Sequence, residues 1–240
     1  MNILEIAVFN IESAIAAEKA GADRIELCEN PYDGGTTPSY GTLKTIREKI
    51  HIPVFPIIRP RGGDFLYSDA EFEVMKQDLQ TAKEFGFTGA VIGLLHPDGT
   101  IDTARTKELV AIGGNMQLTF HRAFDRCKNP LQALEDIVQT GCARILTSGQ
   151  HPNVNNAKAL IKTLVQRADN RIIILPGSGV RSQGLQSLAS ETGAVEFHSS
   201  ARTELPSLMA FTVPTMQETL TNTFVDIDEI KKMKETLRDS

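Results

Sequence analysis

The sequence lacks the features that mark membrane proteins, secreted proteins and nucleic-acid-binding proteins. No apolar stretch approaches the roughly 18 residues that a membrane-spanning helix needs. The opening segment MNILEIAVFN reads as a strand and has neither the basic start nor the cleavage site of a signal peptide. The net charge is a mild −5 without long blocks of like charge, so neither nucleic acid nor a membrane surface is an expected partner.

Cysteine is also scarce. The chain has only Cys28, Cys127 and Cys142, an odd number without the CxxC or zinc-type spacing of a metal site. This pattern is typical of a reduced protein, and we therefore expect a soluble chain that works in the cytoplasm.

The sequence does contain a regular alternation of short strand-like runs and helix-patterned stretches. With 240 residues, of which 41% are hydrophobic, it can bury a sizeable core. Several of the helical stretches begin at a capping residue such as Asn10, Ser68 or Asn129 and end at a glycine. The strand-like runs cover residues 3–8, 23–27, 54–59, 89–95, 117–122, 144–147, 171–175 and 194–198.

Eight strands that alternate with helices in one chain predict a single-domain α/β protein, a (β/α)8 barrel of the TIM type over residues 1–203. An open, doubly wound sheet would need a glycine-rich turn after the first strand, and this turn reads FNIESA. Residues 204–240, with a charged helix near 226–238, do not resemble an ordinary eighth helix. We expect this atypical C-terminal segment to pack on the barrel or to form part of an interface.

Alternate residues of a barrel strand face the interior, and here the inward positions carry charged and reactive side chains. A barrel interior is normally filled by branched apolar residues, and isolated charges there would cost several kcal/mol each. Barrel enzymes place their chemistry at the carboxyl ends of the strands. We therefore predict a site at one mouth of the barrel, to which the inward or strand-end residues Glu5, Glu26, Cys28, Arg59, Arg61, His121, Glu196 and His198 would contribute.

Some of these residues have a structural alternative. Glu5 could equally be the buried partner of an arginine, and Asp125 could cap the turn after strand 117–122 or act in the site. Cys28 could fill the core or serve as a ligand or nucleophile. His121 and His198 share the same inward phase on two strands, which favours a functional role for both.

The loops at the same end of the barrel suggest a binding site for an anion. Arginine forks suit carboxylates and phosphates, and glycine-rich backbone can approach an anion closely. The loops after the seventh and eighth strands often bind phosphate in this fold. The candidate ligand-binding residues are Arg59 and Arg61 in RPRGGDF, Arg122 and Ser148 at strand ends, Gly177 and Ser178 in PGSGVR, and Ser199 in HSSAR.

Several long motifs resemble those of the copper homeostasis protein CutC family. They are IELCENPYDGGTTPSYG, IIRPRGGDFLYS, TFHRAFD, RILTSG, ILPGSGV and EFHSSA, in this order, within residues 1–203. The resemblance implies a cytoplasmic, often dimeric TIM-type barrel with a role in copper handling. It also implies that the family's site positions correspond to Glu26, Cys28, Arg59, Arg61, His121, Arg122, Asp125 and His198. Thr36, Gln150 and Ser178 depart from the family's usual motifs.

Two functional hypotheses follow. In the first, which comes from the resemblance, the protein binds Cu(I) through Cys28 with help from His121, His198 or Cys127. In the second, which comes from the residues, it is a metal-independent enzyme for a small anionic metabolite. The arginines and the two loops would then hold a phosphate or carboxylate. His121 and Glu26 would act as base and acid, and His198 would orient the substrate.

Overall fold

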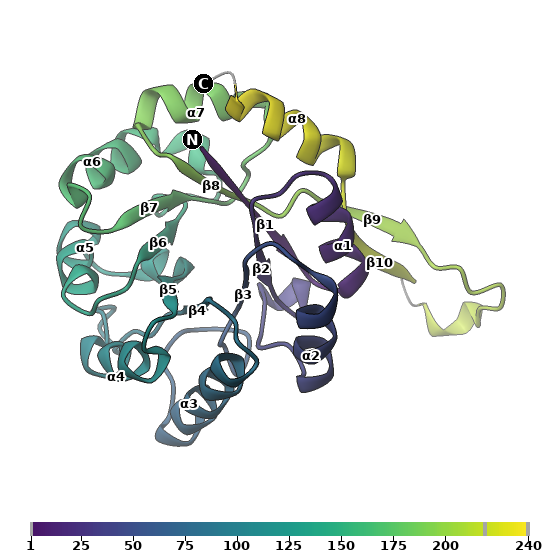
Figure 1. Cartoon of the computed structure of the whole chain (residues 1–240), viewed down its shortest axis with the longest axis horizontal. Coiled ribbons are helices and arrows are strands. Elements are labelled where there is room, and N and C mark those ends of the chain that lie inside the picture. Colours follow the sequence, from purple (N-terminus) through teal and green to yellow (C-terminus); the bar gives the residue numbers. More distant parts are fainter. Residues whose placement is uncertain (1, 218–219, 239–240) are drawn as a thin grey trace.

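The computed structural model describes residues 2–217 and 220–238, and within them a ring of parallel strands is surrounded by helices (Figure 1). The barrel elements are β1 (Ile3–Val8), α1 (Ile11–Lys19), β2 (Arg24–Leu27), α2 (Tyr40–Lys49), β3 (Val54–Pro56), α3 (Asp69–Glu84), β4 (Gly89–Ile92), α4 (Thr103–Gly113), β5 (Gln117–Phe120), α5 (Pro130–Val138), β6 (Arg144–Thr147), α6 (Lys158–Ala168), β7 (Ile173–Pro176), α7 (Ser182–Thr192) and β8 (Glu196–Ser199). The predicted (β/α)8 fold is confirmed.

Two four-stranded parallel sheets, in the orders β3-β2-β1-β8 and β4-β5-β6-β7, together form the barrel. They meet at a bridge between Ile57 and Val91 on one side and through packing of β7 on β8 on the other. Three strands end earlier than expected, β3 at Pro56, β4 at Ile92 and β5 at Phe120. Beyond Pro56 the chain still follows its neighbours, because the N–H groups of Ile57 and Ile58 donate to the carbonyls of Leu27 and Val91.

Local sequence sets several helix starts as predicted. Asn10 and Asn129 accept hydrogen bonds from the first-turn amides of α1 and α5, and Ser68 forms a capping box with Glu71 at the start of α3. The outward strand residues, such as Leu4 and Ile6, are fully buried between the sheet and these helices. The helices are therefore held against the strands by the main hydrophobic core.

The C-terminal segment adds two strands, β9 (Arg202–Pro206) and β10 (Thr221–Val225), and the helix α8 (Ile227–Arg238). Helix α8 packs against α7, α1 and β1, where it closes the ring of helices (Figure 1). It does so because Ile230, Met233 and Leu237 form one buried face. Helix α8 thus packs on the barrel and occupies the place of an eighth barrel helix, although its sequence does not resemble an ordinary one.

The antiparallel pair β9–β10 forms the base of a hairpin that projects from the barrel as an arm (Figure 1). We use the word arm for residues 202–217 and 220–225. No helix in the described part of the chain is long and apolar enough to cross a membrane.

Candidate functional site

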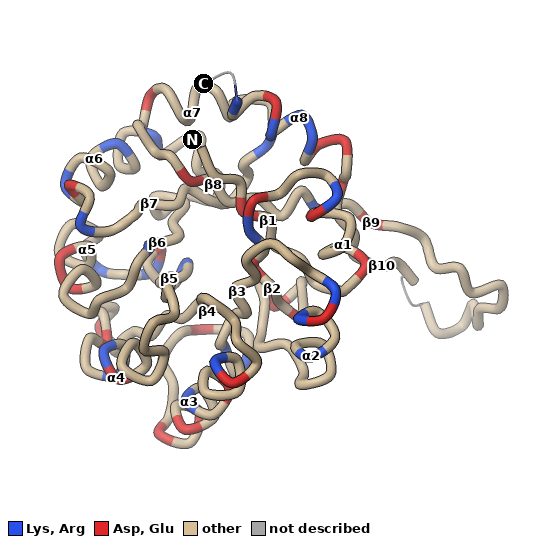
Figure 2. Tube along the Cα trace, in the orientation of Figure 1, with Lys and Arg blue, Asp and Glu red and all other residues tan. Residues whose placement is uncertain are grey.

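A cavity of about 320 Å³ opens at the carboxyl ends of the strands, where the sequence predicted a site. Charged residues occur on the barrel strands as well as on the outer helices (Figure 2). The chemically distinctive residues that line the cavity are Glu26, Cys28, Arg59, Phe65, His121, Arg122, Ser178, Gly179, Arg181, His198, Ser199, Ser200 and Arg202. The cavity volume is at the lower end of the range for ligand pockets, which suits a small metabolite.

A chain of three buried groups, Glu5, His198 and Glu26, runs into the cavity from its floor. Nδ1 of His198 donates to Oε1 of Glu5 over 2.7 Å, and its Nε2 lies 3.7 Å from Oε2 of Glu26. Glu5 has no exposed surface and also accepts a hydrogen bond from Nε of Arg24 over 2.5 Å. Glu5 therefore holds the His198 ring so that the second ring nitrogen faces Glu26.

The charges in this chain shift the pKa values in opposite directions. Burial would raise the pKa of Glu5, but Arg24 and His198 outweigh it and lower that pKa to about 2. Burial raises the pKa of Glu26 to about 7, despite the opposing effect of His198. Burial would lower the pKa of His198, but its hydrogen bond to Glu5 and the nearby carboxylates raise it. Glu26 can thus exchange a proton near neutral pH, beside a His198 whose charged form is favoured by the carboxylates around it.

Glu196 does not contribute to the mouth. It accepts hydrogen bonds from Arg24 over 2.6 Å and from Arg144 over 2.7 Å inside the barrel. The two guanidinium groups lie over the Phe55 ring, at 5.2 and 5.6 Å from its centroid. The interior charges are therefore paired beneath the cavity, and Glu5 links this layer to His198.

His121 is held in a form that suits a hydrogen-bond donor and not a base. Its Nδ1 accepts a hydrogen bond from the backbone N–H of Ala123 over 3.0 Å, so Nε2 carries the proton. Burial and then the charge of Arg59 lower the pKa of His121 to about 3. Nε2 is buried and has no hydrogen-bond partner among the described residues. The geometry therefore does not suit the predicted role of His121 as a base.

Two glycines make room for the histidine rings. A Cβ at Gly93 would lie 2.3 Å from Nδ1 of His121, and one at Gly177 would lie 2.5 Å from Leu146 and 3.2 Å from His198. Gly177, predicted to bind a ligand, does not line the cavity and instead allows His198 to pack closely.

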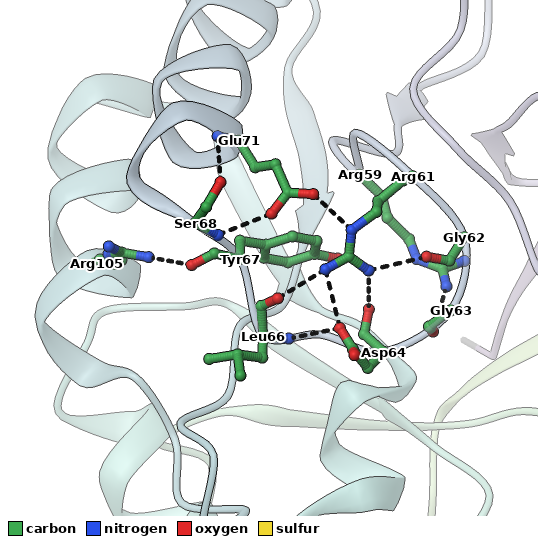
Figure 3. Close-up of polar contacts among 10 residues, drawn as sticks. All are labelled: Arg59, Arg61, Gly62, Gly63, Asp64, Leu66, Tyr67, Ser68, Glu71 and Arg105. Carbon is green, nitrogen blue, oxygen red and sulfur yellow. Dashed lines mark hydrogen bonds and ion pairs between the residues drawn. The ribbon is translucent and has the colours of Figure 1, made fainter.

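Arg59 and Arg61 are close in sequence but face different surroundings (Figure 3). Arg59 lines the cavity, whereas Arg61 does not. The guanidinium of Arg61 bonds to Glu71 over 2.5 Å, to Asp64 over 3.0 Å and to the carbonyl of Leu66 over 2.7 Å. Arg61 therefore organises the loop between β3 and α3, and the structure does not bring the predicted pair of arginines to one ligand.

Arg59 carries a buried charge without an acidic partner. Its side chain donates to the carbonyl groups of Asp33, Gly35 and Gly63 over 2.7–2.9 Å. No carboxylate of the described residues forms an ion pair with it, and its Nε has no hydrogen-bond partner there. Because the residue is 4% exposed, this charge faces the cavity with little water to stabilise it.

The polar residues at the ends of β5 and β6 bind one another. Asp125 accepts hydrogen bonds from Arg122 over 2.7 Å, from Thr147 over 2.5 Å and from the hydroxyl of Ser148 over 2.8 Å. Of this group only Arg122 lines the cavity. Asp125, predicted as catalytic, and Ser148, predicted as a ligand-binding residue, therefore hold Arg122 and the end of β6 in place.

The loops after β7 and β8 do line the cavity, but their serine hydroxyls are used internally. The hydroxyl of Ser178 donates to the carbonyl of Pro152 over 2.8 Å, and that of Ser199 donates to the carbonyl of Val180 over 2.7 Å. Arg181 and Arg202, which we did not predict, line the cavity without a carboxylate partner in the described part of the chain. The sequence could have indicated them, because each is the last residue of a predicted anion-binding motif, PGSGVR or HSSAR.

The donor set does not suit the Cu(I) ion that the family resemblance implies. Cu(I) prefers thiolate or thioether ligands. Cys28 lines the cavity, but burial and the Glu26 carboxylate raise the pKa of its thiol well above the ordinary value. Cys127 lies in the main core, where Gln150 contacts it, and does not line the cavity. The described residues contain no cluster of three or more His, Cys, Asp or Glu that could hold a metal ion.

The fold and the site together define a TIM-type barrel protein with a small cavity that has an excess of unpaired cationic side chains. The family model of the CutC family matches residues 2–203, and the chain belongs to this family.

Relatives of known name span most of the chain. A CutC family protein of Chromobacterium violaceum is 47% identical over 209 residues, which cover 87% of this chain and 85% of that protein. The human copper homeostasis protein cutC homolog is 47% identical and covers 87% of this chain and 77% of its own length. The solved structure of the putative copper homeostasis protein CutC from Streptococcus agalactiae is 35% identical, with a TM-score of 0.80, and covers 83% of this chain and 99% of that one.

Proposed function

We propose that this CutC family protein is a metal-independent enzyme that performs acid–base chemistry on a small anionic metabolite, and that its contribution to copper homeostasis is indirect. The observation that carries the proposal is the buried chain Glu5–His198–Glu26, which opens into a cavity lined by Arg59, Arg181 and Arg202. A perturbed carboxyl pKa inside a cavity is the usual mark of an acid–base site.

The roles of the residues follow from their protonation. Glu26, with its pKa near 7, takes a proton from a bound substrate when it is ionised and returns one when it is protonated. His198, held by Glu5, supplies a positive charge beside the Glu26 carboxylate and exchanges a proton through Nε2. The neutral His121 donates a hydrogen bond through Nε2 to an oxygen of the substrate. Phosphate or carboxylate groups are attracted by the unpaired arginines.

The experiment is a thermal-shift screen of phosphorylated and carboxylated metabolites, followed by NMR of each stabilising compound with the protein in D2O. We expect at least one compound that raises the melting temperature and undergoes proton exchange or conversion. Glu26→Gln should retain binding and lose the reaction, whereas Glu12→Gln, on the exposed face of α1, should keep it. No stabilising compound in a broad panel, or full activity in Glu26→Gln, would refute the proposal.

Direct copper binding is the competing hypothesis, and it makes a different prediction. Tight 1:1 binding of Cu(I), measured in competition with a chelator and lost in Cys28→Ser or Cys127→Ser, would replace the enzyme hypothesis. We expect these variants to leave the affinity unchanged, because the two thiols do not face the same space. All three cysteines are buried and free, which supports a reducing compartment such as the cytoplasm as the place of action.

We also propose that the chain forms a homodimer through the arm. Beyond its base, the arm has no charged residue from 205 to 217 (Figure 2), and it exposes a run of large apolar side chains. These are Leu205, Leu208, Met209, Phe211, Val213, Met216 and Leu220. A symmetric contact between two such arms would remove these side chains from water, and burial of apolar surface is the main driving force of association.

A further inference from the structure

The cavity contains two separate sets of unused donors, and they lie on opposite sides of the barrel. We propose that the substrate carries two acidic groups, a carboxylate bound by Arg59 and His121 and a phosphate bound by the loops after β7 and β8. This inference rests on the proposed function and names its substrate class as small phosphorylated organic acids. The sequence had assigned one anion to Arg59, Arg61 and these loops together.

The first set consists of Arg59 and His121, which follow β3 and β5. Each residue is 4% exposed, and each has a buried nitrogen, Nε of Arg59 and Nε2 of His121, without a partner among the described residues. A buried donor that lacks an acceptor costs about 1–3 kcal/mol, so native structures seldom leave one unexplained, and here two such residues line one cavity. A carboxylate supplies acceptors for both nitrogens and a charge that balances the guanidinium.

Phe65 shields this first set from water. Its ring centroid lies 4.9 Å from that of His121 and 5.0 Å from Cζ of Arg59. In such an apolar setting a charge-assisted hydrogen bond is stronger than it would be in water. The loop that carries Phe65 is the one that Arg61 organises (Figure 3).

The second set lies across the barrel, because the third and seventh strands of an eight-stranded ring face each other. Arg181 and Arg202 supply charge, and the backbone amides of Gly179 and Ser200 have no hydrogen-bond partner in the described ranges. Backbone amides with nearby arginines are the usual partners of a phosphate group. The Ser199 hydroxyl bond to the carbonyl of Val180 joins the two loops, so these donors are already in place without a ligand.

Glu26 and His198 come from β2 and β8, and they line the same cavity as both sets. A substrate that spans the cavity with one acidic group on each set places its carbon atoms beside the Glu26 carboxyl. When Glu26 removes a proton from the substrate, negative charge forms on the oxygens of the carboxylate. Arg59 and His121, which bind this carboxylate, are positioned to stabilise that charge.

The test is a set of binding measurements by calorimetry with inorganic phosphate, glycolate and 2-phosphoglycolate. Because the second group binds as part of the same molecule, we expect 2-phosphoglycolate to bind at least about 100-fold more tightly than phosphate. Arg59→Met should remove most of this gain and leave phosphate binding unchanged. The double variant Arg181→Gln/Arg202→Gln should weaken phosphate and leave glycolate unchanged, and Arg167→Met, on the exposed face of α6, should change nothing.

His121→Phe provides a second variant of the first set, since it keeps the ring packing and removes the Nε2 donor. It also removes the acceptor of the Ala123 N–H, so the melting temperature should fall. The affinity of the folded variant for 2-phosphoglycolate should be about tenfold lower, the effect of one hydrogen bond to a charged group, with phosphate binding unchanged. Equal affinity for phosphate and 2-phosphoglycolate, or loss of phosphate binding in Arg59→Met, would overturn the two-group assignment. Either result leaves the proposed function intact, because that is tested by turnover in Glu26→Gln.

Discussion

At the scale of single residues, the pKa of Glu26 links the site to stability. The folded pKa of about 7 lies above the ordinary value of 4.5, so folding favours the protonated form. Its contribution to stability is present below pH 4.5 and is lost as the pH rises to 7. The effect of Glu26→Gln on the free energy of unfolding should therefore be more favourable at pH 8 than at pH 4.5, by about 3 kcal/mol. Urea denaturation at both pH values measures this, and equal effects would contradict the burial argument.

Glu5 makes the opposite prediction, because its pKa of about 2 lies below the ordinary value. Its stabilisation is present above pH 4.5 and is lost as the pH falls towards 2. Glu5→Gln leaves Arg24 with one fewer buried partner, which should cost about 3–5 kcal/mol at pH 7. It should also lower the pKa of His198, which an NMR titration of the imidazole detects. An unchanged His198 titration would show that Glu5 has only a structural role.

At the scale of elements, the loop between β3 and α3 depends on one arginine. Arg61 ties Asp64 and Leu66 to Glu71 in the first turn of α3 (Figure 3). We expect Arg61→Met to loosen residues 62–67 and thus to displace Phe65 from Arg59 and His121. Amide hydrogen exchange should become faster in this loop, and 2-phosphoglycolate should bind about tenfold more weakly with phosphate unaffected. Unchanged exchange would mean that the backbone holds the loop without Arg61.

At the scale of the whole molecule, the arm decides the assembly. Leu208 is 99% exposed and Phe211 is 74% exposed, so neither supports the barrel of its own chain. The double variant Leu208→Ser/Phe211→Ser should convert a dimer into a monomer in sedimentation velocity, with no loss in melting temperature beyond that due to dissociation. A wild-type protein that sediments as a monomer at micromolar concentration would refute the proposed dimer.

Much of the fold and part of the site could be predicted from the sequence. The alternation of strands and helices predicted the barrel, because the strand and helix periods are local properties of the chain. The two-residue period of the strands also predicted that Glu26, Cys28, His121 and His198 point inward, and all four line the cavity. The position of α8 was not predictable in this way, since the arm separates it from β8 in sequence.

The sequence by itself therefore determined the fold class and the inward phase of the side chains, both of which follow from local periodicity. Only the tertiary structure decided what each polar group bonds to. Glu196 pairs with Arg24 and Arg144 inside the barrel, because these residues are far apart in sequence and meet only after the ring has closed. Arg61 turns to Glu71, which the fold of the loop between β3 and α3 brings next to it. The same closure leaves Nε of Arg59 and Nε2 of His121 without hydrogen-bond partners among the described residues. The two-group site is a property of those remaining donors, and no local pattern in the chain encodes them.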